Sequence, residues 1–408
     1  MIDYGRQFLR FSLNARLFLV SDLFAGLGSG IFSVIFNLYL LRLGYQEDFI
    51  GQVASLGTLA TGLLAIPAGL LADRIGRKRS LVWSIAANSL AVAGMLLLTN
   101  PLAIMAFSFL NGATIALLFV SMSPFLMENS TPDERTHLFS ANSALMYFAM
   151  MGGNLLGGLL PGFWRSWTGS GEATSVLAYR YSLLVALGLF VLAVGPLLAL
   201  RASRPGDGGE STTVAPADLP QVQAGQKIAV LALASGLIGL GAGLFIPFFN
   251  VYFVKVQGAT TAQVGFIFSV SQVLTGLATL AAPLLARRFG KVYAVALGQA
   301  GSVPFLVMLA FVPNLGVAVA AYWSRTVLMN MIQPIQSAFA MEIIPQRLRA
   351  TASSFTNTTW SVAWAASAAI GGALIIRAGY PPIFLLAAVT YALATGLFVL
   401  YFRGYRRL

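Results

Sequence analysis

The chain has 408 residues, of which 58% are hydrophobic and only 9% charged, yet its formal net charge is +12. A soluble globular protein of this size does not bury so much apolar surface, so the composition predicts a membrane protein. The bases lie in short clusters between apolar runs, which argues against a nucleic-acid partner. The chain has no cysteine, which excludes disulfides, thiolate chemistry and cysteine metal sites.

Apolar runs that are long enough to cross a bilayer recur along the whole chain. About 20 apolar residues span the hydrocarbon core of a membrane as a helix. On this basis the sequence predicts twelve membrane-spanning helices. Their approximate ranges are 17–41, 49–72, 80–98, 101–127, 137–163, 180–201, 227–254, 262–286, 292–311, 315–341, 350–376 and 383–402.

The basic residues of the loops predict the orientation of these helices. An even number of spans places both termini on the same side of the membrane. If that side is the cytoplasm, most lysines and arginines lie inside, as the positive-inside rule requires. The bases left on the outer side are Arg42, Arg165, Arg180, Lys255 and Arg377. We therefore expect a multi-pass protein of the cytoplasmic (inner) membrane with both termini in the cytoplasm.

The chain divides into two halves with related sequences. Residues 202–226 are rich in Gly, Pro, Ser and Thr and predict a flexible cytoplasmic linker between six-helix bundles at 1–201 and 227–408. A shift of 213, and of 214 after the first outer loop, aligns polar and glycine positions of the two halves. The aligned pairs include Asn37 with Asn250, Gly51 with Gly265, Asn100 with Asn314, Glu128 with Glu342, and Arg135 with Arg349. Parallel repeats of this kind are typical of transporters, with the substrate site between the halves.

A charged stretch, GLLADRIGRKRSL, separates the second and third spans. Its placed residues are Gly69, Asp73, Arg74, Gly76 and Arg77. This pattern resembles the signature of the major facilitator superfamily, which lies in the same loop. The resemblance covers the whole chain and implies an all-α membrane fold, in which two six-helix bundles are related by a pseudo-two-fold axis along the membrane normal.

The resemblance also implies a role for this stretch as an inner gate. The two glycines allow close backbone approach and a tight turn. Asp73 is expected to contact the start of helix 11 and so to favour the outward-open state. We expect Arg74 and Arg77 to form ion pairs with Glu128, and Glu342 and Arg349 to repeat this arrangement in the second half. The gate residues implied by the resemblance are thus Arg74, Arg77, Glu128, Arg135, Glu342 and Arg349. Arg287 replaces Asp73 in the second half, so the motif is complete only once.

Two ionisable residues lie within predicted spans, where such residues are rare and usually functional. Asp22 shares a helix face with Gly26, Ser33 and Asn37. A carboxyl group in an apolar environment can bind and release a proton near neutral pH, which makes Asp22 a candidate for proton coupling. The alternative is that Asp22 pairs with a cytoplasmic base.

The second such residue, Arg325, lies in a stripe with Met329, Gln333 and Gln336. A cation in a cavity would attract an anionic or strongly polar substrate group. The alternative is that Arg325 binds backbone carbonyls or outer carboxylates such as Glu47. Many proton-coupled members of the superfamily carry an arginine in helix 4, where this chain has Asn111 instead. That departure puts the common coupling route in doubt.

Polar and aromatic side chains on several spans predict a substrate cavity. Amides there can select a solute by hydrogen bonding, while aromatic rings supply contact area. The candidate residues are Asn37, Asn250, Gln272, Arg325, Gln333, Gln336, Asn357 and Trp360.

Three functions remain open on this basis. The first is a secondary transporter that moves a small organic solute by alternating access, as a proton-coupled efflux permease. The second is an importer or facilitator of a polar or anionic nutrient, such as a sugar or an organic anion. The third is a receptor or scaffold that transports nothing. We expect no enzymatic activity, cofactor or metal. The expected partners of this monomer are a small-molecule substrate, the lipid bilayer and, for coupled transport, protons.

Overall fold

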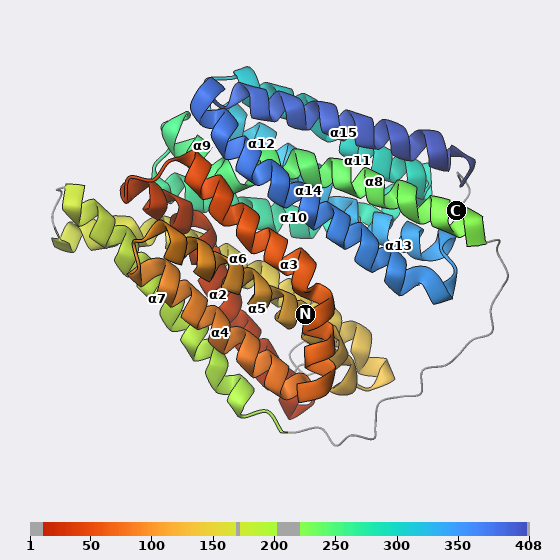
Figure 1. Ribbon diagram of the computed structural model, residues 1–408, viewed down its shortest axis with the longest axis horizontal. Helices are drawn as coiled ribbons and strands as arrows, with labels where there is room; N and C mark the ends of the chain where they lie inside the picture. The colour runs from red at the N-terminus through yellow and green to blue at the C-terminus, as the bar shows by residue number, and fades with distance from the viewer. Residues whose placement is uncertain (1–10, 169–171, 202–220, 406–408) are drawn as a thin grey trace. The chain divides into compact units, whose positions relative to one another are not determined.

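The computed structural model describes residues 11–168, 172–201 and 221–405, in which every element is a helix (Figure 1). The first six are α2 (Leu13–Arg42), α3 (Glu47–Ile75), α4 (Arg77–Leu97), α5 (Pro101–Glu128), α6 (Pro132–Thr168) and α7 (Glu172–Leu198). The second half has α8 (Gln221–Phe245), α9 (Phe249–Lys255), α10 (Thr261–Phe289), α11 (Lys291–Phe311), α12 (Leu315–Met331), α13 (Gln333–Ile343), α14 (Arg349–Ala378) and α15 (Pro381–Phe402). Short 3₁₀ turns cover Ile246–Phe248, Gln346–Leu348 and Arg403–Tyr405.

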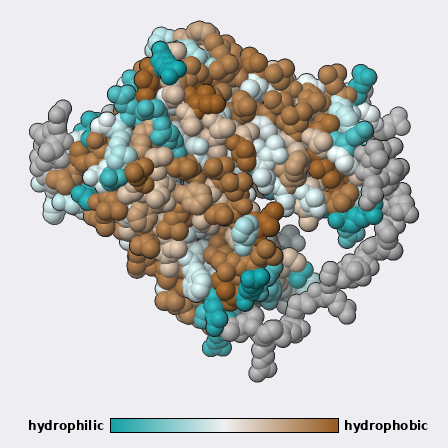
Figure 2. All heavy atoms as spheres, viewed as in Figure 1, coloured by the Kyte–Doolittle hydropathy of each residue, from teal (hydrophilic) through white to brown (hydrophobic). Residues whose placement is uncertain are grey.

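The number of predicted spans is confirmed. Within the described residues, twelve helical segments are long and apolar enough to cross a membrane. Large hydrophobic side chains also lie on their outer surfaces, for example Ile66 at 63% and Leu280 at 78% exposure. Hydrophobic residues cover much of the face in Figure 2. Such a surface is stable in contact with lipid tails, whereas in water it would cause association.

Paired residues of the sequence repeat begin equivalent helices. The side chain of Asn100 caps α5 by accepting from Leu102 N at 2.9 Å, and that of Asn314 caps α12 by accepting from Val317 N at 3.1 Å. Gly76 and Gly290 precede α4 and α11 with φ of 88° and 77°, a conformation that favours glycine. These repeated residues therefore mark repeated helix starts.

Proline interrupts two helices of the second half that were predicted to be continuous. Pro247 lies in the turn Ile246–Phe248 that separates α8 from α9, and Pro334 lies in the first turn of α13, directly after α12. Proline has no N–H group to donate to the preceding turn, and its ring clashes with the carbonyl there. The first-half counterpart of α8 and α9 is α2, which runs unbroken from Leu13 to Arg42.

The chain forms two compact units, and helix packing follows the same pattern in both. The first unit contains residues 1–43, 63–212 and 261–272, and the second contains 44–62, 213–260 and 273–408. In the first unit, α2 packs on α6 and α7, and α4 packs on α5 and α7. In the second unit, α8 packs on α14 and α15 as α2 does on α6 and α7, and α11 packs on α12 and α15 as α4 does on α5 and α7. This repeated packing places α8, α11, α12, α13 and α14 around the cavity described below.

Each unit contains part of a helix from the other half of the sequence. Residues 44–62, the start of α3, belong to the second unit, and residues 261–272, the start of α10, belong to the first. A Cβ added at Gly51 would collide with the carbonyl oxygen of Ala368 on α14. One added at Gly265 would meet the carbonyl oxygen of Asn154 on α6. Small residues allow this close helix approach. The division of the chain at the linker stays a prediction.

The last part of the expected linker, residues 221–226, is helical. Residues 202–220 lie outside the described residues, but α8 already begins at Gln221. Ala224 is buried, and the ammonium group of Lys227 lies 5.1 Å from the ring centre of Tyr405. These contacts extend the helix into a segment whose composition had favoured a loop.

Candidate functional site

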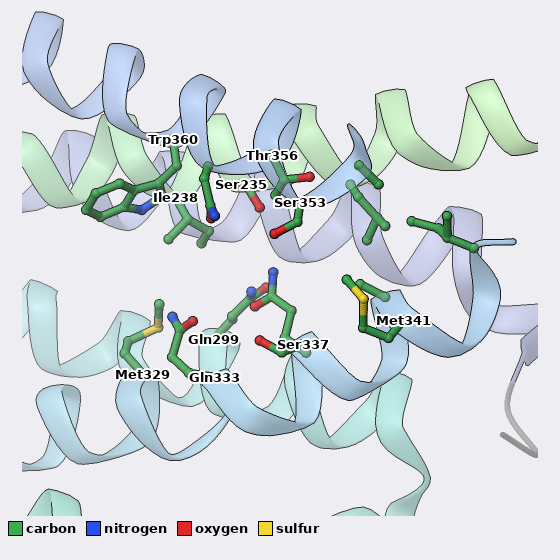
Figure 3. A pocket seen from close by; sticks show the side chains of 16 residues that line it. Ser235, Ile238, Gln299, Met329, Gln333, Ser337, Met341, Ser353, Thr356 and Trp360 are labelled. Carbon is green, nitrogen blue, oxygen red and sulfur yellow. The ribbon is translucent and has the colours of Figure 1, made fainter. Parts of the chain in front are cut away.

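A cavity of about 440 Å³ lies inside the second unit. Residues of α8, α11, α12, α13 and α14 line it, as Figure 3 shows for ten of them. The lining side chains are Leu231, Ser235, Ile238, Gln299, Met329, Gln333, Gln336, Ser337, Ala340, Met341, Ile344, Ala352, Ser353, Thr356, Asn357 and Trp360. The volume lies within the range of pockets that bind small molecules.

Helical periodicity brings these polar groups to the cavity. On α13, Gln333, Gln336 and Ser337 are three and four residues apart, and on α14 Ser353, Thr356 and Asn357 have the same spacing. Residues at these spacings share one helix face. Figure 3 shows Gln333, Gln299 and Ser337 on one wall and Ser353, Thr356 and Trp360 on the wall opposite. Two polar stripes therefore face each other across the cavity.

Half of the lining residues are polar, and among the described residues that line the cavity none is acidic or basic. The lining combines amides and hydroxyls with the indole of Trp360 and the thioethers of Met329 and Met341. Gln299 is held in place because the Thr395 hydroxyl donates to its Oε1 at 3.2 Å. This arrangement suits binding of a solute by hydrogen bonds and apolar contact.

Four of the predicted cavity residues line this cavity together: Gln333, Gln336, Asn357 and Trp360. Asn250 and Arg325 belong to the same unit but are not among the lining residues. Asn37 and Gln272 belong to the first unit. The structure therefore gathers half of the predicted set in one cavity, and a substrate contact for any of these residues stays a prediction.

Asn250 is buried at the helix break, where its Oδ1 accepts from Val251 N at 3.0 Å. Its side chain therefore accepts from a backbone N–H group in the first turn of α9, directly after the break. Since that break depends on a proline that the first half lacks, the alignment with Asn37 did not indicate it.

Arg325 lies in an aromatic environment instead of the cavity. Its side chain is buried and donates to the Tyr391 hydroxyl, and its guanidinium carbon lies 4.7 Å from the ring centre of Phe245. Aromatic faces attract a desolvated cation. Arg325 does not line the cavity, and its described partner is Tyr391 rather than Glu47, so a role of Arg325 in binding a substrate stays a prediction.

Several polar lining residues were not predicted, namely Ser235, Gln299, Ser337, Ser353 and Thr356. Serine and threonine are common in membrane helices, so no single one of them stands out. The repeat contained one signal, because the shift of 213 aligns Ser235 with Asp22. Equivalent positions of the two halves therefore both carry a polar group on the first helix of their half.

Asp22 lies on α2 in the first unit. Its Oδ2 is buried and has no hydrogen-bond partner in the described part of the chain. The expected alternative, an ion pair with a cytoplasmic base, is not formed there. An unpaired buried carboxylate is costly, whereas the protonated form is cheaper to bury. The arrangement is compatible with a group that gains and loses a proton.

The predicted gate motif forms ion pairs within the first unit. Arg77 lies 2.7 Å from Asp73 and 3.7 Å from Glu128, measured between nitrogen and oxygen. The expected bridge to Glu128 is therefore confirmed for Arg77, while Arg74 makes no ion pair in the described chain. Gly76 makes the expected turn. The expected close approach at Gly69 stays a prediction.

The second half repeats this ion pair with other residues. Lys291, aligned with Arg77 by the shift of 214, pairs with Glu342, the counterpart of Glu128. Arg349 instead donates to the carbonyl of Ile344 at 3.3 Å. The Nε of Arg135 is buried without a partner in the described residues. The expected pairing of Glu342 with Arg349 was thus wrong, and the contact of Asp73 with helix 11 stays a prediction.

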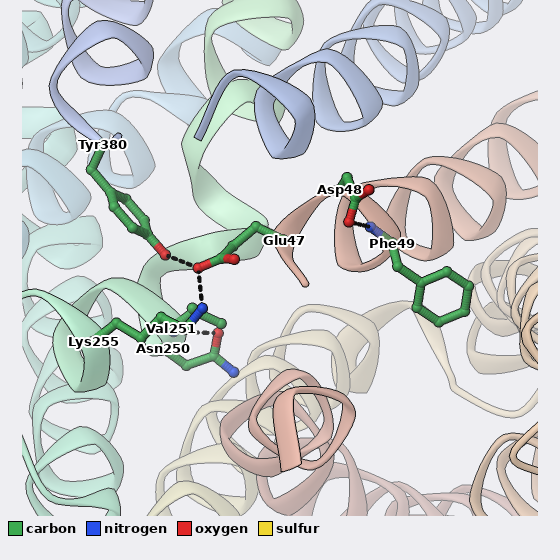
Figure 4. Close-up of polar contacts among 7 residues, drawn as sticks. All are labelled: Glu47, Asp48, Phe49, Asn250, Val251, Lys255 and Tyr380. Atoms are coloured by element: carbon green, nitrogen blue, oxygen red, sulfur yellow. Dashed lines mark hydrogen bonds and ion pairs between the residues drawn. The ribbon is translucent and has the colours of Figure 1, made fainter. Parts of the chain in front are cut away.

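A buried carboxylate joins the start of α3 to helices of the second half. The Glu47 side chain is 6% exposed and accepts from Lys255 Nζ at 2.8 Å and from the Tyr380 hydroxyl at 3.3 Å (Figure 4). Burial, and then the charge of Glu47, raises the pKa of Tyr380. The hydroxyl therefore stays protonated and donates to Glu47 at physiological pH. All three residues belong to the second unit.

Comparison with known proteins gives one family and several relatives. The family model described as Major Facilitator Superfamily matches residues 18–368 and 231–407. The multidrug resistance protein MdtG of Yersinia enterocolitica is 29% identical over 160 residues, which cover 38% of this chain and 39% of that protein. The gallate transporter of Pseudomonas putida is 27% identical over 176 residues, which cover 43% of this chain and 36% of that protein. Each match thus spans about two fifths of the relative's length.

Solved structures share the fold along nearly the whole chain. The nucleoside transporter NupG superposes with a TM-score of 0.77 at 15% identity, covering 96% of this chain and 99% of that one. A bacterial homologue of the iron transporter ferroportin, in its inward-facing state, gives a TM-score of 0.72 at 15% identity, covering 95% and 98%. At such identities the likeness concerns the fold alone.

Proposed function

Because the chain belongs to the major facilitator superfamily, we propose that it is a secondary transporter that moves a small organic solute across the cytoplasmic membrane by alternating access. The observation that carries this proposal is the cavity of the second unit, where two polar helix faces meet within a membrane-spanning bundle. Gln299 and Ser235 are buried there, and polar groups in such a bundle are expensive unless they serve packing or a ligand. The protein acts as a monomer, with both termini in the cytoplasm, and catalyses no reaction.

We further propose that transport is efflux coupled to protons. The buried Oδ2 of Asp22, which has no hydrogen-bond partner among the described residues, supports a proton carrier in the first unit. The match to a relative named for multidrug resistance supports efflux. A proton that neutralises Asp22 removes the penalty of a buried charge, so its binding and release can bias a two-state transporter.

Import or facilitated passage of a polar nutrient is the second candidate. The amides of Gln299, Gln333 and Gln336 favour it, because they suit a solute rich in hydroxyl groups. A relative named as a gallate transporter points in the same direction. Arg325 does not add to this case, because its guanidinium group faces Tyr391 and Phe245.

Counterflow in proteoliposomes tests the transport function. Vesicles loaded with unlabelled uridine, gallate or tetraphenylphosphonium are diluted into the same labelled compound. We expect saturable, transient accumulation of at least one label, because exchange through alternating access needs no energy source. Vesicles with heat-denatured protein serve as the control. No saturable counterflow of any compound would indicate a receptor or scaffold instead.

Asp22→Asn tests proton coupling in the same vesicles. With an imposed pH gradient, we expect the wild type to respond and the variant to lose that response, since an amide does not titrate. Counterflow without a gradient should continue in the variant. Asp48→Asn is the matched control, because within the described chain this carboxylate accepts a local hydrogen bond from Phe49 N at 2.7 Å. An unchanged gradient response in Asp22→Asn removes Asp22 from the mechanism.

A further inference from the structure

We propose that the cavity of the second unit takes an uncharged solute that presents hydrogen-bonding groups to the amides and hydroxyls and an apolar or aromatic face to Trp360. This inference names the substrate class of the proposed transporter and rests on that function. It separates this site from one for organic anions, which the sequence had left open, and equally from one for organic cations.

The described residues that line the cavity carry no charge, and this favours an uncharged solute. All sixteen lining side chains are neutral: amide, hydroxyl, thioether, indole or aliphatic. A charged solute that leaves water needs an opposite charge or several strong hydrogen bonds to offset its lost hydration, and a neutral polar solute needs far less. The described lining therefore offers no opposite charge to an ion of either sign and favours a neutral solute.

The position of Arg325 strengthens this conclusion. It precedes Met329 by one turn on α12, close to the cavity in sequence, yet its guanidinium group lies over the rings of Phe245 and Tyr391, at 4.7 and 5.6 Å from their centres. Its hydrogen bond to Tyr391 holds it there. Arg325, which the sequence suggested as a binding partner for an anionic substrate, thus interacts with aromatic side chains instead.

The hydrogen-bonding groups define the polar side of the solute. The hydroxyl of Thr395 shares its proton between the carbonyl of Tyr391 at 2.7 Å and the side-chain oxygen of Gln299 at 3.2 Å, so Gln299 offers its amide N–H groups as donors and a remaining lone pair as an acceptor. Gln333 and Gln336 each offer donors and an acceptor, and the hydroxyls of Ser353 and Thr356 offer both. A solute with several hydroxyl, carbonyl or ring-nitrogen groups matches this mixture.

Trp360 defines the apolar side. Its indole and the side chains of Ile238 and Met329 all line the cavity, and Figure 3 shows Trp360 and Met329 on opposite walls. Indole faces stack on flat rings, and methionine sulfur contacts aromatic rings favourably. An uncharged ring with polar substituents, such as a nucleoside or an aromatic amide, combines both requirements.

Matched pairs of probes that differ in charge test the proposal. The full chain, purified in detergent, is titrated with uridine against uridine 5′-monophosphate, 3,4,5-trihydroxybenzamide against gallate, and benzyl alcohol against benzylammonium. The thermal unfolding midpoint is the readout, because a ligand that binds only the folded state raises it. We expect an uncharged member to raise the midpoint, and its charged partner to bind at least about tenfold more weakly.

Gln333→Glu provides the second arm. A carboxylate in the cavity should weaken binding of the uncharged probes by about tenfold or more and introduce a response to benzylammonium. The control is Gln346→Glu, which makes the same change at an exposed residue before α14 and should leave every response unchanged. A variant that failed to fold would show no cooperative transition, in which case Gln336→Glu replaces it.

The outcomes separate this inference from the proposed function. Equal or stronger binding of a charged member overturns the inference, as does a midpoint that no uncharged probe raises at millimolar concentration. If one of these two results were obtained but a charged probe showed saturable counterflow, the substrate class would be wrong and the proposed transport function would still hold. Binding of an uncharged probe without saturable counterflow of that probe would support the substrate class and overturn transport.

Discussion

Gly51→Ala is expected to destabilise the packing of α3 on α14 and to shift the protein toward states in which their predicted outer halves separate. An added Cβ would collide with the carbonyl oxygen of Ala368 and approach the ring of Phe248 to 3.2 Å. A backbone carbonyl within a helix cannot move aside as a flexible side chain does. Overpacking of this kind costs about 1–3 kcal/mol, enough to change a two-state equilibrium by roughly tenfold or more.

The absence of cysteine makes this shift measurable. Ser361→Cys introduces a single, buried thiol on α14, opposite Gly62. In right-side-out vesicles, a membrane-impermeant maleimide should label this thiol faster in the Gly51→Ala background. Gly396→Ala is the control, because a Cβ at that position of α15 meets no described atom within 4 Å. Equal labelling rates in both backgrounds would mean that the Gly51 contact does not resist opening.

The repeat predicts a second variant with the same effect. Gly265→Ala places a Cβ against the carbonyl of Asn154, and the shift of 214 relates this pair to Gly51 and Ala368. The contacts between Gly372 and Glu47 and between Gly158 and Thr261 are related in the same way. Evolution of the two halves has therefore kept a backbone contact that needs glycine, while the side chains around it have diverged.

The sequence predicted the spans well because their signal is local. Each helix must be apolar over its own length, and asparagine caps and glycine turns mark several ends. The interruptions at Pro247 and Pro334 were missed, although proline is visible in the sequence. Membrane helices often continue through a proline when neighbours satisfy the freed backbone groups. Pro124, inside α5, is an example in this chain.

The candidate site was only half predictable because it depends on helix rotation. Gln333, Gln336, Asn357 and Trp360 were chosen as polar or aromatic residues on suitable spans, and they meet in the cavity. Arg325 satisfied the same criterion, but the neighbouring aromatic residues, which come from α8 and α15, attract its guanidinium group. Contacts between residues so far apart in sequence leave no local pattern.

Charge partners were least predictable for the same reason. The repeat correctly indicated that Glu342 would form an ion pair like that of Glu128, but the partner is Lys291 and not Arg349. The alignment of two identical residues, Arg135 and Arg349, suggested Arg349 as the partner of Glu342. The alignment of Arg77 with Lys291 indicates the observed partner.

Glu47→Ala is expected to weaken the same end of α3 by a different mechanism, the loss of a buried hydrogen-bond acceptor. The Tyr380 hydroxyl is buried and would lose its partner, which costs about 1–3 kcal/mol. The Lys255 side chain is 44% exposed, so water screens its charge and the lost ion pair adds at most about 1 kcal/mol. We expect faster outside labelling of Ser361→Cys, as for Gly51→Ala, and a lower unfolding temperature.

Glu47→Gln separates the two contributions, because an amide oxygen still accepts from Tyr380 while the charge is lost. Its effect should therefore be smaller than that of Glu47→Ala, and Asp48→Asn, next in the chain, should have none. Because the pKa of Tyr380 is raised, its hydrogen bond contributes fully below about pH 10, the ordinary pKa of tyrosine, and is lost only as the pH rises further. If Glu47→Gln and Glu47→Ala label at the same rate, the ion pair with Lys255, and not the tyrosine hydroxyl, holds α3 in place.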